Sequence, residues 1–198
     1  MVQLAPELSC LGFSRAEEWN FVRFAGGGIM HRLSFDVSGR EPGGFSFGCG
    51  VGIRFEEIER VIGRSDQGQY KATIGMPIHL LREDQRYDRW FFSTPGSLQR
   101  VVREVLSEVR RYALLFLERY SSLDALRAAL ESNPSNWFGL GPSGRIEVLA
   151  AILFVQDGAE FALSFLSSKL KDETTKPPLR TGDLLVLKRK LAELSQHF

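Results

Sequence analysis

The sequence predicts an α+β fold, with an antiparallel sheet of about five strands packed by helices and an all-helical C-terminal part. Three observations predict it. Segments with two-residue alternation fill the first half of the chain, glycine-rich turns separate them, and segments with helical spacing fill the second half. Because strands and helices are grouped rather than alternating, an antiparallel meander is favoured over parallel βαβ units.

The chain begins with a predicted helix and a predicted hairpin. A short helix is expected at about residues 3–11, and an aromatic, extended segment follows at 18–24. Glycines at 26–28 suit a hairpin turn, because glycine accepts positive φ without strain. The turn length leaves the hairpin register open, and with it the question of whether Arg23 faces His31.

The second strand of this hairpin, at 29–37, has the cleanest alternation. Four apolar residues and one histidine share a face, namely Ile29, His31, Leu33, Phe35 and Val37. Such alternation is typical of a strand with one buried face.

The segment 45–55, FSFGCGVGIRF, raises the question of whether its glycines hold a phosphate. A phosphate-binding loop requires Lys and Ser or Thr after its last glycine, and the dinucleotide fingerprint requires glycine where Ile53 stands. Neither requirement is met. The odd positions from Phe45 to Ile53 are all apolar, and the even positions carry Ser46 and three glycines, so a strand with one nearly bare face is predicted.

The bare face carries Gly48, Gly50 and Gly52. Glycine weakens a strand interior, so a close neighbour is expected against this side. One explanation is a helix or crossing chain packed tightly on the sheet. The other is a flat ligand or the backbone of a partner.

Two more strands and a short helix are expected next. The helix spans 55–63 and is closed by Gly63. The strands span 74–82 and 89–93, and Pro77 indicates that the first of them lies at an edge of the sheet.

The remaining segments are predicted to be helical. Thr94 and Pro95 begin a long helix, and Ser121 with Asp124 forms a capping-box pattern for the next one. After a linker at 133–144, helices are expected at 145–156, 159–171 and 183–196, the first so apolar that it must be buried nearly all round. This organisation predicts an α+β sheet domain at 1–132 and a helical subdomain at 143–198, or one continuous domain.

Several phrases resemble an uncharacterised family of bacterial domains of unknown function. They are LGF at 11–13, WNFVRF, DRWFF, and VRRYALLFLERYSSLDALRAAL. The resemblance covers roughly residues 8–132, with a looser echo at 146–171. It implies a short helix, a strand meander ending at a tryptophan, and a long helix, and it carries over no active site.

Composition argues against several classes of function. The net charge is +1 and no basic stripe emerges, which argues against a nucleic-acid binder. The longest apolar run, at 148–155, is far shorter than a membrane-spanning helix, which needs about 20 residues. Neither a signal peptide nor a dense disulfide framework is expected from the N-terminus and the two cysteines, so a reducing cytoplasm is the expected location. We expect no cofactor and no metal site.

Candidate catalytic residues are few. His31 and Cys49 both lie on apolar strand faces, where a nucleophile pair is conceivable but a core role is favoured. The paired carboxylates are adjacent in sequence, as at Glu56 and Glu57, which is typical of solvated surfaces.

The best candidate for a recognition surface is the segment 80–92. It contains Arg86, Tyr87, Arg89 and Trp90, residue types that are enriched at interface hot spots, although a solvated loop with Trp90 in the core explains them as well. The sequence therefore favours a non-catalytic bacterial protein-binding module with another protein as partner, by analogy with toxin-neutralising immunity proteins. The alternative is a small-ligand binder or enzyme with a pocket beside the glycine-faced strand.

Overall fold

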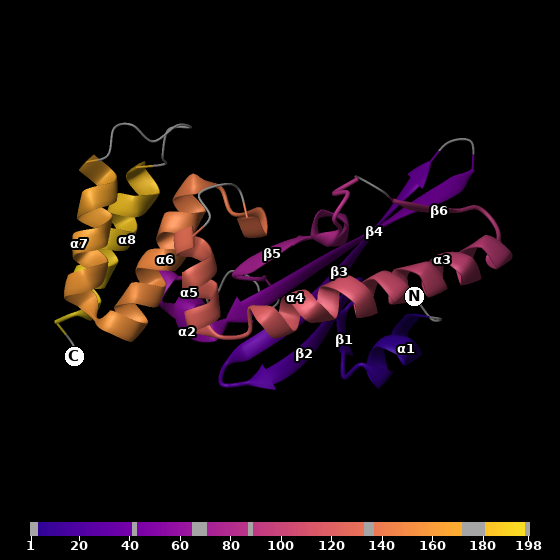
Figure 1. The fold of residues 1–198 in the computed structure, drawn as a ribbon, viewed down its shortest axis with the longest axis horizontal. Coiled ribbons are helices and arrows are strands. Elements are labelled where there is room, and N and C mark those ends of the chain that lie inside the picture. The colour runs from indigo at the N-terminus through magenta and orange to yellow at the C-terminus, as the bar shows by residue number, and fades with distance from the viewer. Residues whose placement is uncertain are drawn as a thin grey trace. The chain divides into compact units, whose positions relative to one another are not determined.

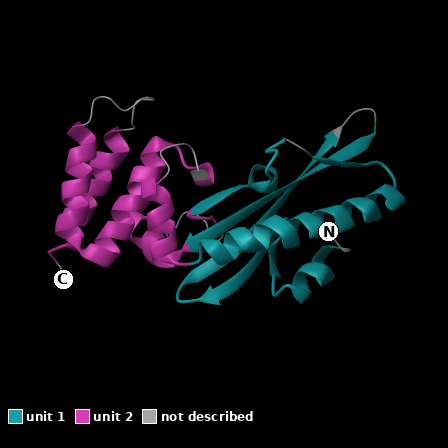
Figure 2. Cartoon of the chain, viewed as in Figure 1, with its two compact units in different colours: residues 1–54, 74–121 teal, residues 55–73, 122–198 magenta. Residues whose placement is uncertain are grey.

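The computed structural model describes residues 4–40, 43–64, 71–86, 89–132, 137–171 and 181–196. Contacts divide the chain into two compact units, with residues 1–54 and 74–121 in unit 1 and residues 55–73 and 122–198 in unit 2 (Figure 2). Each unit therefore takes its residues from two separate stretches of the chain. Unit 1 contains the sheet and unit 2 is helical, which confirms the predicted α+β fold.

The described part of unit 1 forms a six-stranded antiparallel sheet (Figure 1). Its strands are β1 (Ser14–Glu17), β2 (Asn20–Gly26), β3 (Ile29–Arg40), β4 (Gly44–Phe55), β5 (Ile74–Pro77) and β6 (Trp90–Phe92). The order is β1-β2-β3-β4-β5, and β6 also pairs with β4. β5 pairs with residues 50–53 of β4 and β6 with residues 45–47, so two short strands share one long neighbour.

The register of the β2–β3 hairpin places Arg23 opposite His31. The three glycines at 26–28 all have positive φ, between 57° and 89°, which explains why this turn needs glycine. The structure thus gives the register of this hairpin, which the sequence left open.

Helices of unit 1 pack on one face of the sheet (Figure 1). They are α1 (Leu4–Cys10), α3 (Pro95–Glu108), the π-helical turn η2 (Val109–Ala113) and α4 (Leu114–Arg119), with the 3-10 turn η1 (Ile78–Leu81) after β5. α3, η2 and α4 are one continuous helix, which confirms the predicted long helix. Its N-terminus is capped as predicted by Thr94, whose Oγ1 accepts the Ser97 N–H at 3.2 Å.

The π-helical turn has a cause in the buried stripe of this helix. Val101, Val105, Val109 and Ala113 are all buried and are spaced four residues apart. In an α-helix of 3.6 residues per turn, such a stripe drifts around the axis. At η2 the Leu114 N–H bonds to the Val109 carbonyl, five residues back, and this wider turn returns the stripe to the sheet.

Unit 2 is built around one helix. Its elements are α2 (Glu56–Ile62), α5 (Leu123–Ser132), the 3-10 turn η3 (Trp137–Gly139), α6 (Pro142–Asp157), α7 (Ala159–Lys171) and α8 (Thr181–Leu194). α6 contacts α2, α5, α7 and α8, and every residue from Ile146 to Leu153 is buried, as the apolar sequence predicts. Glu147 within this run forms an ion pair with Arg64.

Two predicted strands differ from the observed ones. The strand expected at 18–24 begins at Asn20, because residues 18 and 19 form the turn of a hairpin between β1 and β2. The strand expected at 74–82 ends at Pro77, which has no N–H for the ladder, and the chain continues as η1. No helix formed by the described residues is long and apolar enough to cross a membrane.

The predicted capping box at Ser121 and Asp124 is wrong by one residue. The cap of α5 is Ser122, whose Oγ accepts the Ala125 N–H at 3.2 Å. The Ser121 side chain is engaged elsewhere, by His31 and by the Leu117 carbonyl.

Substituting Ser122→Ala is expected to lower the free energy of unfolding by about 1 kcal/mol, because the first turn of α5 loses its side-chain acceptor. Urea denaturation measures this loss. Ser132→Ala, at the other end of the same helix, is the control and should change stability by less than about 0.5 kcal/mol. Equal losses from both variants would contradict the assignment of Ser122 as the cap.

Candidate functional site

An ion pair crosses the bare face of β4 at Gly48. Asp36 on β3 pairs with Arg89, and Arg89 also donates to the Asp36 carbonyl at 3.4 Å. The pairing of Phe47 with Trp90 places Arg89 opposite Gly48. A Cβ at Gly48 would overlap the Asp36 carboxylate, so glycine is needed here for the ion pair to pass over the strand.

The residues around this ion pair share one face of the sheet. We call it the glycine face and define it as Ser34, Asp36 and Ser38 of β3, Ser46, Gly48, Gly50 and Gly52 of β4, and Arg89 and Phe91. A Cβ at Gly50 would lie 2.8 Å from Ser34 Oγ, and Ser38 bonds to Ser46 at 2.6 Å. The nearest neighbours of a Cβ at Gly48 or Gly50 are thus atoms of Asp36, Ser34 and Met76, which belong to the adjacent strands.

The structure brings together only part of the predicted recognition segment. Arg89 joins the glycine face, whereas Arg86 lies in an exposed turn where its N–H donates to Asp84 Oδ1 at 3.2 Å. Trp90 points to the opposite face of the sheet. Tyr87 lies outside the described residues.

Trp90 belongs to an aromatic row on the helix-covered face. Phe21, Phe35, Phe47 and Trp90 follow one another across β2, β3, β4 and β6, with ring centroids 5.3–6.4 Å apart. Contacts at these distances stabilise neighbouring strands. Trp90 is half-buried, so its main role is in this row.

Phe91 is the residue that sequence analysis did not single out. It pairs with Ser46 and is 47% exposed on the glycine face. The alternation in the sequence WFF carried the signal, because Phe91 must point away from its two aromatic neighbours.

His31 is held in a buried hydrogen-bond network. Arg23 donates to its Nδ1 from Nη2 at 3.0 Å and from Nε at 3.3 Å. Nδ1 therefore accepts and Nε2 carries the proton, which His31 donates to Ser121 Oγ at 2.6 Å. Burial, with the positive charge of Arg23 as the second cause, lowers the pKa of His31 to about 4.

Arg23 extends this network to the start of the chain. It donates to the Leu11 carbonyl at 3.2 Å and lies over the ring of Phe13, 5.0 Å from its centroid. The network links β2 and β3 to the loop after α1 and the residues after α4, which is a structural role.

Cys49 lies apart from His31. Ser38 bonds to Ser46, and Asp36 lies against Gly48, so the register of β3 and β4 places Phe35 opposite Cys49. His31 is four residues from Phe35 along β3, which corresponds to about 13 Å at the rise of a strand. Cys49 is buried, and burial, followed by the charges of Asp36 and Glu108, raises the pKa of its thiol. A neutral, enclosed thiol is a poor nucleophile.

The described residues contain no group of three or more His, Cys, Asp or Glu side chains that could hold a metal ion. In unit 2, an apolar groove of about 400 Å³ lies among Glu57, Arg60, Val61, Phe154, Val155, Gly158, Ala159, Leu194 and Ser195. Its walls are mostly apolar, as in sites for small apolar ligands.

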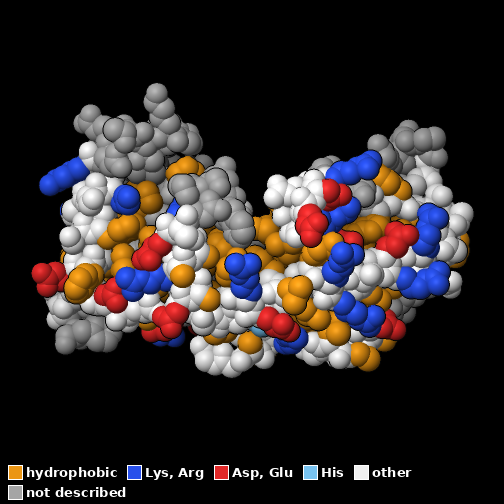
Figure 3. Space-filling model, viewed as in Figure 1, with side chains coloured by type: hydrophobic (Ala, Val, Ile, Leu, Met, Phe, Trp, Pro, Cys, Tyr) orange, Lys and Arg blue, Asp and Glu red, His pale blue; other side chains and the backbone are white. Residues whose placement is uncertain are grey.

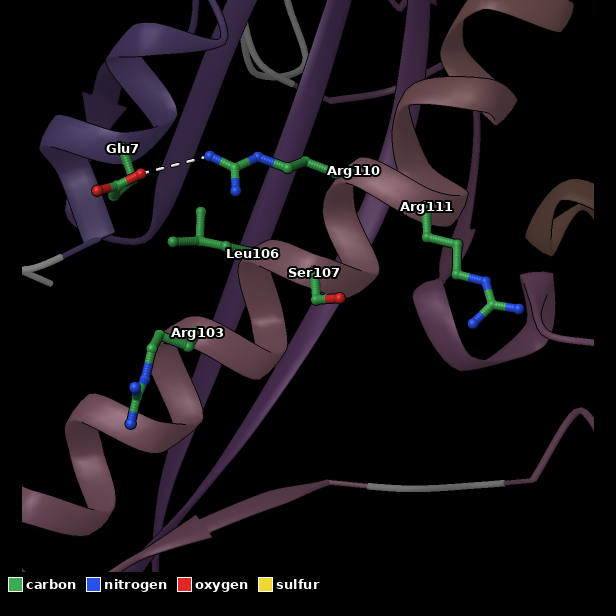
Figure 4. Close-up of a pocket in the computed structure, with 6 residues that line it drawn as sticks. All are labelled: Glu7, Arg103, Leu106, Ser107, Arg110 and Arg111. Atoms are coloured by element: carbon green, nitrogen blue, oxygen red, sulfur yellow. Dashed lines mark hydrogen bonds and ion pairs between the residues drawn. The ribbon is translucent and has the colours of Figure 1, made fainter.

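A second groove lies on the helical face of unit 1. It has a volume of about 620 Å³ and is lined by Glu7, Arg103, Leu106, Ser107, Arg110 and Arg111 (Figure 4). Several other Lys and Arg side chains lie along this face of unit 1 (Figure 3).

No protein-family model matches the chain, and no curated protein or solved structure is similar enough to match it.

Proposed function

We propose that the protein is a non-catalytic module that binds another protein through the glycine face. The observation that carries this proposal is the exposure of Phe91, at 47%, on the face of the sheet that also carries the Asp36–Arg89 ion pair. An exposed aromatic ring supplies apolar contact area to a partner.

The charges of the glycine face add to this proposal. The Asp36 side chain is 64% exposed although it pairs with Arg89, so its carboxylate is accessible to a partner. Arginine and aromatic residues are enriched at protein interfaces, and both are present here.

A toxin-neutralising role is the most specific form of the proposal and rests on analogy with small bacterial binding domains. In this form the partner is a toxin, and the glycine face covers the surface that the toxin needs for its activity. Rescue of cells from that toxin is the corresponding readout.

The state of His31 and Cys49 favours a binding module over an enzyme. Both ring nitrogens of His31 are hydrogen-bonded inside the protein, and burial raises the pKa of the Cys49 thiol. A general base or nucleophile has to reach its substrate, and neither side chain is exposed. The apolar groove of unit 2 supports small-ligand binding as a second candidate function.

Site-specific photo-crosslinking tests the proposal. A benzophenone amino acid placed at Phe91 is expected to crosslink one defined protein in the native host. The matched control is Leu115, which is 61% exposed on the helical layer of the same unit and should not crosslink that protein. A crosslink from both positions, or from neither with the partner expressed, would reject the glycine face as the binding surface.

A further inference from the structure

The groove on the helical face of unit 1 carries an inference that is independent of the glycine face. Arg103, Ser107 and Arg111 are spaced four residues apart, so they follow one another along the exposed surface of the continuous helix α3–η2. Figure 4 shows Ser107 between the two arginines, with Arg103 on the side of α1, as are Leu106 and Arg110, and Arg111 on the opposite side. Leu106, which is buried, forms the apolar part of the groove.

The two outer arginines have no carboxylate partner within the part of the chain that the structure describes. Among the described residues, neither Arg103 nor Arg111 forms an ion pair, and Arg111 only lies over the ring of its neighbour Tyr112, 5.2 Å from the centroid. Arg110 pairs with Glu7, but the distance is 3.4 Å and both side chains are more than half exposed. An exposed pair of this kind contributes little and exchanges readily with another carboxylate.

The spacing of the arginines selects the kind of ligand. Arg103 and Arg111 are eight residues apart, which corresponds to about 12 Å along a helix. Because the two side chains point away from each other (Figure 4), a single phosphate or carboxylate does not contact both. An extended chain covers about 13 Å in four residues, and side chains four residues apart point to the same side.

We infer that this groove binds an extended acidic segment of a partner protein, with carboxylates four residues apart contacting Arg103 and Arg111. Ser107, between the arginines, donates or accepts a hydrogen bond with the peptide backbone. On the α1 side of the groove, the Glu7 carboxylate accepts from Arg110.

Titration with a synthetic peptide, followed by amide and arginine side-chain chemical shifts in ¹⁵N NMR, tests the inference. The probe is Gly-Glu-Ser-Gly-Ser-Glu-Gly with blocked ends. The spacing control has the same composition with adjacent glutamates. We expect the shift changes to cluster at residues 103–111, binding to weaken as salt is added, and the control peptide to bind several-fold more weakly.

Substitutions complete the test. Arg103→Gln and Arg111→Gln should each weaken binding of the probe about three- to fivefold, the range of one exposed ion pair. Arg100→Gln is the matched control on the same helix, because Arg100 already pairs with Glu104 at 3.7 Å. All three side chains are exposed, so the variants should fold as the parent does.

Several results would overturn the inference. They are shift changes away from the groove, equal losses in all three variants, equal binding of the two peptides, and tighter binding of inorganic phosphate or a single-stranded oligonucleotide.

Discussion

Lowering the pH from 7 to 4 is expected to remove about 3 kcal/mol from the free energy of unfolding through His31 alone. The pKa of His31 falls from 6.5 to about 4 on folding. Between these values the unfolded chain binds a proton at this residue and the folded protein does not. Stability from His31 is therefore complete above about pH 6.5 and is lost as the pH falls towards 4.

Urea denaturation at several pH values measures this loss. His31→Gln removes the titrating group while an amide can still bond to Arg23 and Ser121, so its stability should fall less steeply over the same range. Where that variant does not fold, direct titration of the His31 ring by NMR gives the same information. Parallel pH profiles, or a ring that titrates near 6.5, would contradict the assigned network.

Substituting Gly75→Ala is expected to cost about 2 kcal/mol. A Cβ at this position would lie 2.8 Å from the Val51 carbonyl oxygen and 3.2 Å from the Gly52 Cα. Both atoms belong to the backbone of β4, which pairs with β5 at Gly52 and Gly75, so only a shift of one strand can make room. Urea denaturation measures the loss.

Gly48→Ala is the matched comparison for Gly75→Ala. Here the added methyl group meets the Asp36 carboxylate, the end of an exposed side chain that can rotate away. The lost ion pair is worth less than about 1 kcal/mol and is partly offset by the better strand propensity of alanine. Equal destabilisation by the two substitutions would show that the strand backbones yield as easily as the side chain.

The spacing of apolar residues along the sequence predicted those strands and helices that bury only one of their faces. The glycines of β4 fall on one face and its apolar residues on the other, and the helix from Thr94 follows from its cap and its spacing. β1 escaped prediction because SRAE has no apolar alternation, and its pairing with β2 comes from the hairpin.

Contacts between distant residues could not be predicted in the same way. In the sequence Ser121 has the stronger capping pattern, because Asp124 follows three residues later. Its side chain bonds instead to His31, 90 residues away, and Ser122 is the cap. Arg89 reaches the glycine face through Asp36, 53 residues away. The glycines and Arg89 of the candidate site were therefore identified by residue type. That Arg89 and Asp36 pair across Gly48 follows from the order of the strands, which the sequence does not reveal.

The division of the chain into interleaved units sets an order for folding on the ribosome. All residues of unit 1 have been synthesised once residue 121 is made, but α2, which lies between the two stretches of unit 1, packs against α6. Arg64 and its partner Glu147 are 83 residues apart. At about 5–20 residues per second, roughly 4–17 s pass between their synthesis. During that interval the apolar side chains Ile58 and Val61 lack the helix that α2 packs against, so this segment exposes apolar surface until α6 is made.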